Sequence, residues 1–328
     1  MLELVLDFFR ALWAVLRGRT RRGPLRPGWS FATELNQAFV RRMLMGSLTR
    51  GIPWLRAAEA RAPRLDRVLR SVRFTPVDAG GVRAVWCRPA SGRESDRIVL
   101  YLHGGGYVIG SPEGHRELLA HLAVQAEARV LAVDYRLGPE NVFPAAQEDC
   151  IASYRWLLAQ GNDPSRLAVA GDSAGGALAL AVLQQARNAG DPLPAAAALL
   201  CPWVDPLARG GSLEENAECD FGTRELLVSW IDAYMGASDA ANPLVSPIHA
   251  DLAGLPPLLV QWGGAEILRD QVRAFVERAR AAGLDVSAHE WPHMFHDWML
   301  FHATVPEAAG ATHQLGEFLR RRVKGGLA

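Results

Sequence analysis

The sequence predicts an α/β fold in which a mostly parallel central sheet carries helices on both faces. Short apolar runs of strand length recur along the chain, and longer stretches of helical composition lie between them. At residues 171–175, one apolar run passes directly into a helical stretch through a Gly-Asp-Ser-Ala-Gly turn. The chain has 328 residues and is 49% hydrophobic, so it can bury one large core and still carry a further subdomain.

The charge balance gives no sign of a nucleic-acid partner. Lysine plus arginine and aspartate plus glutamate each number 35, so neither a basic surface nor an acidic tail is expected. Four cysteines are scattered without Cys-x-x-Cys spacing, which predicts a reduced protein in the cytoplasm: Cys87, Cys150, Cys201 and Cys219.

Residues 1–16 are mostly apolar but fit neither a signal peptide nor a membrane span. Two acids interrupt them, no basic segment precedes them, no small-residue cleavage site follows, and a span requires about 20 residues. In a helix, charged residues share one face and apolar residues form the other: Glu3, Asp7, Arg10 and Arg17 against Leu2, Leu6, Phe9, Trp13 and Leu16. We expect the apolar face to dock on the protein's own body, with weak contact to a lipid surface as the alternative.

The next segments change from helical to strand pattern. A loop is expected at residues 19–27, and helices over residues 31–45 and 55–70, none with a catalytic motif. Residues 72–77 and 82–87 then flank a Gly-Gly pair, which predicts an antiparallel hairpin that opens the sheet.

A buried strand at residues 97–102 leads into a His-Gly-Gly-Gly tetrad at residues 103–106. Consecutive glycines let the backbone approach a ligand closely and turn N–H groups toward one point, which an oxyanion requires. A plain loop and a phosphate cradle are the alternatives, but no Gly-Lys-Ser/Thr ending follows that would favour phosphate.

Ser173 lies in the turn between a strand at residues 167–170 and a helix at residues 174–189. Such a turn pushes the hydroxyl out above the carboxyl ends of a parallel sheet, and its glycines fit where strand and helix pack too closely for a Cβ. An ordinary glycine-rich turn is the alternative. The assignment of Ser173 as a nucleophile therefore depends on partners elsewhere in the chain.

Four segments together resemble the bacterial hormone-sensitive-lipase-like esterases, also called family IV. They are Leu-His-Gly-Gly-Gly-Tyr at 102–107, Asp-Tyr-Arg-Leu-Gly-Pro-Glu at 134–140, Phe-Pro-Ala-Ala at 143–146 and Gly-Asp-Ser-Ala-Gly-Gly at 171–176. The resemblance extends from about residue 72 to the end of the chain. It implies an α/β-hydrolase fold with a helical cap, and a serine carboxylesterase that needs no cofactor and acts on a small-molecule ester.

The resemblance also implies an oxyanion hole. In the family's pattern, the backbone N–H groups of Gly105, Gly106 and Ala174 hold the oxyanion. Gly104 is the turn that positions them, and His103 completes the motif.

The remaining pattern divides the chain into a body and a cap. Residues 71–205 and 249–328 form the expected hydrolase body, whereas residues 1–70 and 206–248 form the expected cap. Three aromatic residues of the second cap segment either line an acyl pocket or simply pack: Phe221, Trp230 and Tyr234.

The expected acid of the catalytic triad is Glu266. It follows a strand at residues 257–262 and stands between Ser173 and the later histidine, in the chain order serine, acid, histidine. The family carries Asp-Pro-Leu-x-Asp here, whereas this chain has Glu-Ile-Leu-Arg-Asp, so Asp270 is the alternative acid. A glutamate is an accepted orienting acid in α/β-hydrolases.

The expected base is His296, in the loop after a strand at residues 286–290. It matches the histidine of the family's His-Gly-Phe segment, although Asp297 and Trp298 replace the glycine and the phenylalanine. The nearby His-Glu-Trp-Pro-His at residues 289–293 spells a zinc-protease motif. That motif needs a helix, and a proline within a strand pattern rules one out, so no metal is expected.

Together these residues predict hydrolysis of short- to medium-chain carboxylic esters through an acyl-enzyme. Amide hydrolysis is an alternative, because arylacetamide deacetylases share the motifs. A ligand-binding protein is another, as in the plant gibberellin receptors, but those lack a working histidine. The natural substrate, the acyl length and a possible homodimer stay open at this point.

Overall fold

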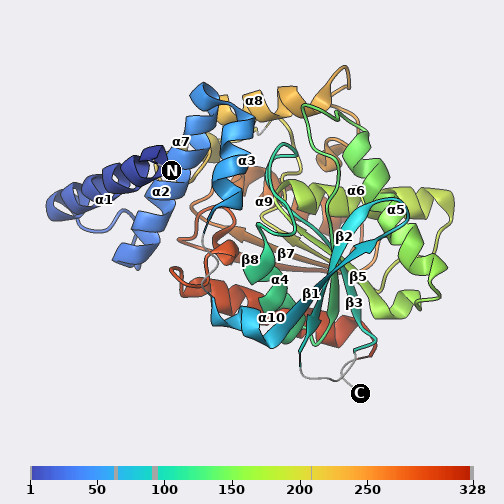
Figure 1. The fold of residues 1–328 in the computed structure, drawn as a ribbon. Coiled ribbons are helices and arrows are strands. Elements are labelled where there is room, and N and C mark those ends of the chain that lie inside the picture. Colours follow the sequence, from blue (N-terminus) through green and yellow to red (C-terminus); the bar gives the residue numbers. More distant parts are fainter. Residues whose placement is uncertain (1, 63–65, 91–94, 208, 326–328) are drawn as a thin grey trace.

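An eight-stranded sheet forms the centre of the computed structural model, which describes residues 2–62, 66–90, 95–207 and 209–325 (Figure 1). The strand order is β1-β2-β4-β3-β5-β6-β7-β8. Strand β2 is antiparallel to β1 and β4, and all other neighbours are parallel, as predicted. The strands are β1 Val72–Asp78, β2 Arg83–Pro89, β3 Ile98–Leu102, β4 Arg129–Val133, β5 Leu167–Asp172, β6 Ala196–Leu200, β7 Leu258–Gly263 and β8 Val286–Trp291.

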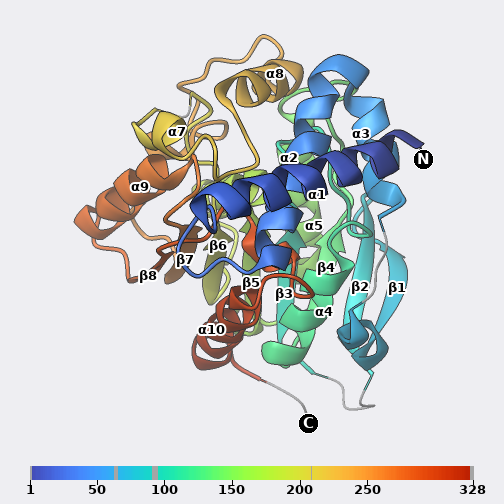
Figure 2. The same cartoon turned by 90° about the vertical axis from the view of Figure 1, so that its left-hand side faces the viewer.

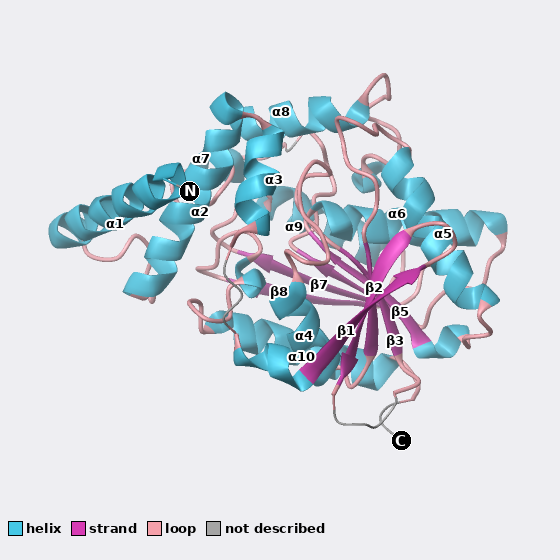
Figure 3. Cartoon of the chain, in the orientation of Figure 1, coloured by secondary structure: helices cyan, strands magenta, loops and turns pink. Residues whose placement is uncertain are grey.

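Helices cover both faces of this sheet, which confirms the predicted α/β class (Figure 3). Side chains of β3 alternate between the two resulting cores: Leu100 and Leu102 belong to one, Val99 and Tyr101 to the other. The first core is closed by α5 Ala145–Ala159, α6 Ala174–Ala189 and α9 Arg269–Ala281, and the second by α4 Arg116–Gln125 and α10 Glu307–Arg322. The sheet is therefore buried on both sides, and its functional groups collect at one edge.

The N-terminal helices differ from their predicted bounds. They are α1 Leu2–Arg22, α2 Phe31–Arg50 and α3 Ile52–Ala60. The loop expected from residue 19 begins only after Arg22. The helix expected over residues 55–70 is confirmed only at its start. Helix α3 begins directly after Gly51, where φ is +83°, and it ends at Ala60, before a proline in the sequence. A short 3₁₀ turn, Arg67–Ser71, then leads into β1.

Helices α1, α2 and α3 lie on the same side of the molecule as α7 Ser212–Glu215 and α8 Arg224–Met235 (Figures 1 and 2). Helix α2 contacts both α3 and α8, so segments far apart in the sequence meet there. In the described part of the chain, every helix is too short or too polar to cross a bilayer.

The predicted docking face of α1 is also wrong. The residues that α1 buries are Asp7, Ala11 and Val15, whereas Phe9 and Trp13 of the apolar face are 58% and 61% exposed. The physical reason is an ion pair of 2.8 Å between Asp7 and Arg50 of α2, which turns the side of α1 with Asp7, Ala11 and Val15 inward.

Candidate active site

Ser173 occupies a strained turn between β5 and α6. Its φ of 51° and ψ of −119° are unusual for a residue with a side chain, and such strain is typical of functional sites. A Cβ on Gly171 or Gly175 would collide with the backbone that crosses there, including the carbonyl of Leu102. The glycines of the motif thus allow the close packing that raises Ser173 above the sheet.

His296 reaches Ser173 from the loop after β8. The distance from its Nε2 to the Oγ of Ser173 is 2.8 Å, and its ring is largely buried. Glu266, in the loop after β7, is fully buried, and its Oε2 lies 3.4 Å from Nδ1 of His296. The three residues expected from the sequence are therefore brought together.

Asp270 is engaged elsewhere. Its Oδ2 accepts a hydrogen bond of 2.9 Å from the backbone N–H of Ser212, and its Oδ1 lies 2.9 Å from Nε of Arg269. Asp270 thus connects the start of α9 to α7.

Asp220 was not singled out in the sequence, yet it joins the two loops that carry the acid and the histidine. Its Oδ1 accepts from the backbone N–H of His296 at 3.0 Å, and its Oδ2 accepts from that of Ile267 at 2.6 Å. Burial raises the pKa of its carboxyl. Because Asp220 lies in an irregular segment with no motif, only the folded chain reveals this role.

The glycine loop after β3 lines the same cavity as Ser173 and His296. Gly105 and Gly106 have φ of +112° and +58°, and a Cβ on Gly106 would collide with Trp230 of α8. Within the described residues, no group accepts a hydrogen bond from the N–H of Gly105, Gly106 or Ala174. These three N–H groups thus remain available to a ligand.

His103 supports the loop. It is fully buried, its Nδ1 donates to the carbonyl of Gly104 at 2.8 Å, and its ring stacks on Tyr135 with centroids 4.2 Å apart. Burial lowers the pKa of His103 to about 3, so its ring is neutral.

A polar cluster that the sequence did not predict lies next to the serine turn. Asp172, fully buried, accepts a bond of 2.6 Å from the hydroxyl of Tyr101 and lies 3.1 Å from Nε2 of His115. Burial opposes the charged form of His115, but the carboxylate of Asp172 outweighs it and raises the pKa of His115 to about 9. The cluster anchors the residue that precedes Ser173.

Asp297 adds a second carboxyl beside the histidine. Its Oδ2 lies 3.2 Å from Nε2 of His296, the nitrogen that also faces Ser173. Burial lowers the pKa of His296, but Asp297, Glu266 and Asp220 together raise it to about 10. Burial, with Asp172 and Glu266 nearby, raises the pKa of Asp297 well above its usual range. Asp297 and His296 therefore hold a proton between them at neutral pH.

A cavity of about 460 Å³ opens above Ser173. Apolar side chains from α2, α3 and α8 line it, among them Phe39, Met43, Leu55, Leu226 and Trp230. Phe221 also lines it, whereas Tyr234 stacks on Tyr107 with centroids 3.8 Å apart and is buried. Of the three aromatic residues considered from the sequence, two line the cavity and one packs.

The zinc-protease motif at residues 289–293 does not lie on a helix. His289 lies on β8 and His293 in the turn that follows, and both are exposed. Among the described residues, Cys201, His296 and Asp297 are the one group whose ligand atoms lie within 4.8 Å of one another. That group includes the histidine already bonded to Ser173.

Comparisons with known proteins identify relatives of this chain. A model of the α/β-hydrolase fold family matches residues 99–300. An acetyl-hydrolase of Streptomyces hygroscopicus is 46% identical over 257 residues, covering 76% of this chain and 84% of that protein. The carboxylesterase NlhH of Mycobacterium tuberculosis is 34% identical over 259 residues, covering 76% and 81%. Among solved structures, an esterase of the bacterial hormone-sensitive lipase family has a TM-score of 0.77 at 41% identity. The match covers 97% of this chain and 98% of that chain. EstE5, soaked with p-nitrophenyl butyrate, has a TM-score of 0.80 at 34% identity, covering 96% and 98%.

Proposed function

Because the chain belongs to the hormone-sensitive-lipase-like esterases of the α/β-hydrolase superfamily and is a carboxylic ester hydrolase, we propose that it acts through an acyl-enzyme formed on Ser173. The observation that carries the proposal is the contact of 2.8 Å between Ser173 and His296, with Glu266 on the other side of the ring.

In the acylation step, Nε2 of His296 takes the proton of the Ser173 hydroxyl as Oγ attacks the ester carbonyl. The carbonyl oxygen becomes an oxyanion, which the N–H groups of Gly105, Gly106 and Ala174 would hold. When the tetrahedral intermediate collapses, the ester C–O bond breaks and the imidazolium gives its proton to the leaving alcohol. Glu266 fixes the tautomer of His296 and stabilises the imidazolium.

Deacylation repeats these steps with water. His296 takes a proton from a water molecule, whose oxygen attacks the acyl carbon. Collapse of the second intermediate returns the proton to Oγ of Ser173 and releases the carboxylic acid. Both half-reactions use the same groups.

The cavity supports the proposal that the substrates carry short- to medium-chain acyl groups. Its apolar walls suit a hydrocarbon chain, and about 460 Å³ lies within the range of pockets for small ligands. The soaked p-nitrophenyl butyrate of EstE5 is a short-chain ester. A panel of p-nitrophenyl esters from acetate to laurate, with the matching anilides, tests the proposal. We expect kcat/KM to peak at short to medium esters; turnover of anilides but not esters would contradict it.

We also propose that the chain is organised as a catalytic body and a cap. We propose that residues 1–70 and 206–248 act together as a cap over residues 71–205 and 249–328. In support, Gln37 of α2 donates Nε2–H to the backbone carbonyl of Asp220 at 3.0 Å. Hydrogen–deuterium exchange with and without a bound phosphonate tests this, since α2 and α8 should gain protection together. Protection confined to the body would contradict the division.

We also propose that the protein works in the cytoplasm, a reducing compartment. All four cysteines are free and buried: Cys87, Cys150, Cys201 and Cys219. Trapping thiols by alkylation during cell lysis should find every one of them reduced, and a disulfide-linked form would contradict this location.

A further inference from the structure

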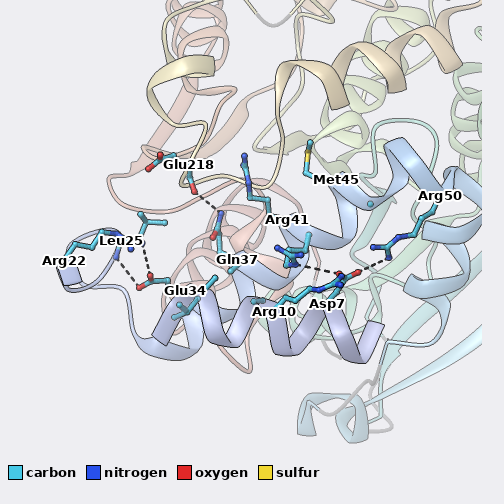
Figure 4. A pocket seen from close by; sticks show the side chains of 16 residues that line it. Asp7, Arg10, Arg22, Leu25, Glu34, Gln37, Arg41, Met45, Arg50 and Glu218 are labelled. Atoms are coloured by element: carbon cyan, nitrogen blue, oxygen red, sulfur yellow. Dashed lines mark hydrogen bonds and ion pairs between the residues drawn. The ribbon is translucent and has the colours of Figure 1, made fainter. Parts of the chain in front are cut away.

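The side of helix α1 that carries Asp7 packs against helix α2 (Figure 4). Asp7 lies 2.8 Å from Arg50 and 3.7 Å from Arg42, both on α2. Near the other end of α1, Arg19 lies 2.9 Å from Glu34 of α2. The carboxylates of Asp7 and Glu34 are each only 2% exposed, so these contacts fix how α1 is rotated about its own axis.

This rotation turns the apolar face of α1 away from the protein. Phe9, Trp13 and Leu16 are 58%, 61% and 48% exposed. Six of the twelve exposed large apolar side chains found among the described residues lie on this one helix: Val5, Leu6, Phe8, Phe9, Trp13 and Leu16. Apolar residues gathered in this way mark an interaction surface, whereas scattered ones need no explanation.

Positive charge borders this apolar face. Helix α1 carries five arginines and only two carboxylates, although the whole chain has no formal net charge. By the helical period, Arg10, Arg17 and Arg21 lie along one edge of the apolar face. Arg17 stacks over the ring of Trp13 at 5.0 Å. A basic helix with Trp, Phe and Leu on one face is typical of segments that lie in the surface of a membrane.

We propose that α1 binds the surface of an anionic phospholipid membrane. The rings of Phe9 and Trp13 would enter the boundary between headgroups and acyl chains, and the bordering arginines would meet the phosphates. A second copy of the chain fits less well, because it would bring two sets of arginines to one interface. The proposal goes beyond ester hydrolysis, since this binding needs no catalytic group.

Docking by α1 also has a consequence for the substrate. Helix α2, on which α1 rests, lines the catalytic cavity through Phe39 and Met43. An enzyme held in this way has a wall of its cavity close to the lipid, where apolar esters concentrate. This second step rests on the proposed function, whereas membrane binding does not.

Sedimentation of the full chain with vesicles tests the proposal. The vesicles are phosphatidylcholine alone, or phosphatidylcholine and phosphatidylglycerol in equal parts. We expect binding to the anionic vesicles, weakened at least tenfold in F9S/W13S. Each removed arginine in R17Q/R21Q should weaken it about fivefold. The control V124S/V228S removes two exposed apolar residues elsewhere, 40% and 50% exposed, and should bind like the wild type.

Turnover of a soluble ester by each variant shows that the fold and the active site are intact, and it separates failure of membrane binding from failure of the proposed function. Equal binding to neutral and anionic vesicles would overturn the proposal, as would unchanged binding of F9S/W13S. Light scattering supplies a further test. A dimer that becomes a monomer in F9S/W13S would identify a second copy as the true occupant of the face.

Discussion

The residues around Ser173 fall into two groups. Those of the first group contact the serine hydroxyl directly or through His296, and those of the second hold the surrounding loops in place. Glu266 and His296 belong to the first group by their distances, and Asp172 and Asp220 to the second. The serine, its acid and its histidine could be proposed from chain order and motif. Asp172 and Asp220 could not, because their partners lie 47 to 76 residues away and meet them only in the folded chain.

Replacing Glu266 and Asp270 separately tests which acid serves the triad. Glu266→Gln should lower turnover by about four orders of magnitude, the loss seen when the orienting acid of a serine-protease triad is removed. Asp270→Asn should keep most of the turnover and instead lose about 1–2 kcal/mol of stability, because its carboxylate accepts from a backbone N–H. Kinetics and urea unfolding of both variants decide the matter. Loss of turnover in Asp270→Asn at unchanged stability would contradict the assignment.

Asp297 should set the pH at which the enzyme becomes active. His296 must be neutral at Nε2 to accept the serine proton, and its pKa is raised to about 10. The acidic limb of the pH–rate profile should therefore lie above the usual range of a histidine. The charged or titratable groups that face His296 are Asp297, Glu266, Asp220 and Cys201. Of these, Asp297 is the one that contacts Nε2.

Asp297→Asn should consequently lower the pKa of His296 and move the acidic limb of the pH–rate profile down by about one pH unit or more. The measurement is kcat/KM against pH for the wild type and the variant. His302→Gln is a suitable control, because that histidine contacts Thr312 and His121 and does not line the catalytic cavity. An acidic limb that stays in place in Asp297→Asn would show that this carboxyl does not govern the titration.

Among the structural elements, helix α8 packs so closely against the glycine loop after β3 that the loop has no room for a Cβ at Gly106. Gly106→Ala should place a Cβ against Trp230 and shift the loop, which should lower kcat by about 10² to 10³, and the left-handed φ of +58° should cost about 1–2 kcal/mol of stability. Adding Trp230→Ala removes the collision, so the double variant should recover part of the loss. A double variant as slow as Gly106→Ala would mean that the backbone conformation, and not contact with α8, requires the glycine.

Some features of the helices and strands could be predicted from the sequence, and others could not. The hairpin of β1 and β2 and the buried strands were predictable, since alternation and apolar runs are local signals. The face that α1 buries was not. Its amphipathic pattern located an apolar face, but Asp7 pairs with Arg50, 43 residues later, and that partner decides which face turns inward.

For the whole molecule, the order of the sheet explains how distant segments form one site. The glycine loop follows β3, Ser173 follows β5, Glu266 follows β7 and His296 follows β8. These four strands are parallel, so their carboxyl ends open at one edge, where open α/β sheets place ligands. The family resemblance predicted this convergence. The shape of the cavity, which α2, α3 and α8 line, had to come from the folded chain.

Covalent labelling tests whether Ser173 is the nucleophile of the esterase reaction. The protein is treated with a serine-reactive organophosphate, digested and analysed by mass spectrometry, alongside Ser173→Ala. We expect one adduct, on Ser173, in step with the loss of esterase activity. Ser173→Ala should remain folded, take no label and turn over esters about six orders of magnitude more slowly. An adduct on another residue that accompanies inactivation, or a folded Ser173→Ala variant that keeps its activity, would show that Ser173 is not the nucleophile.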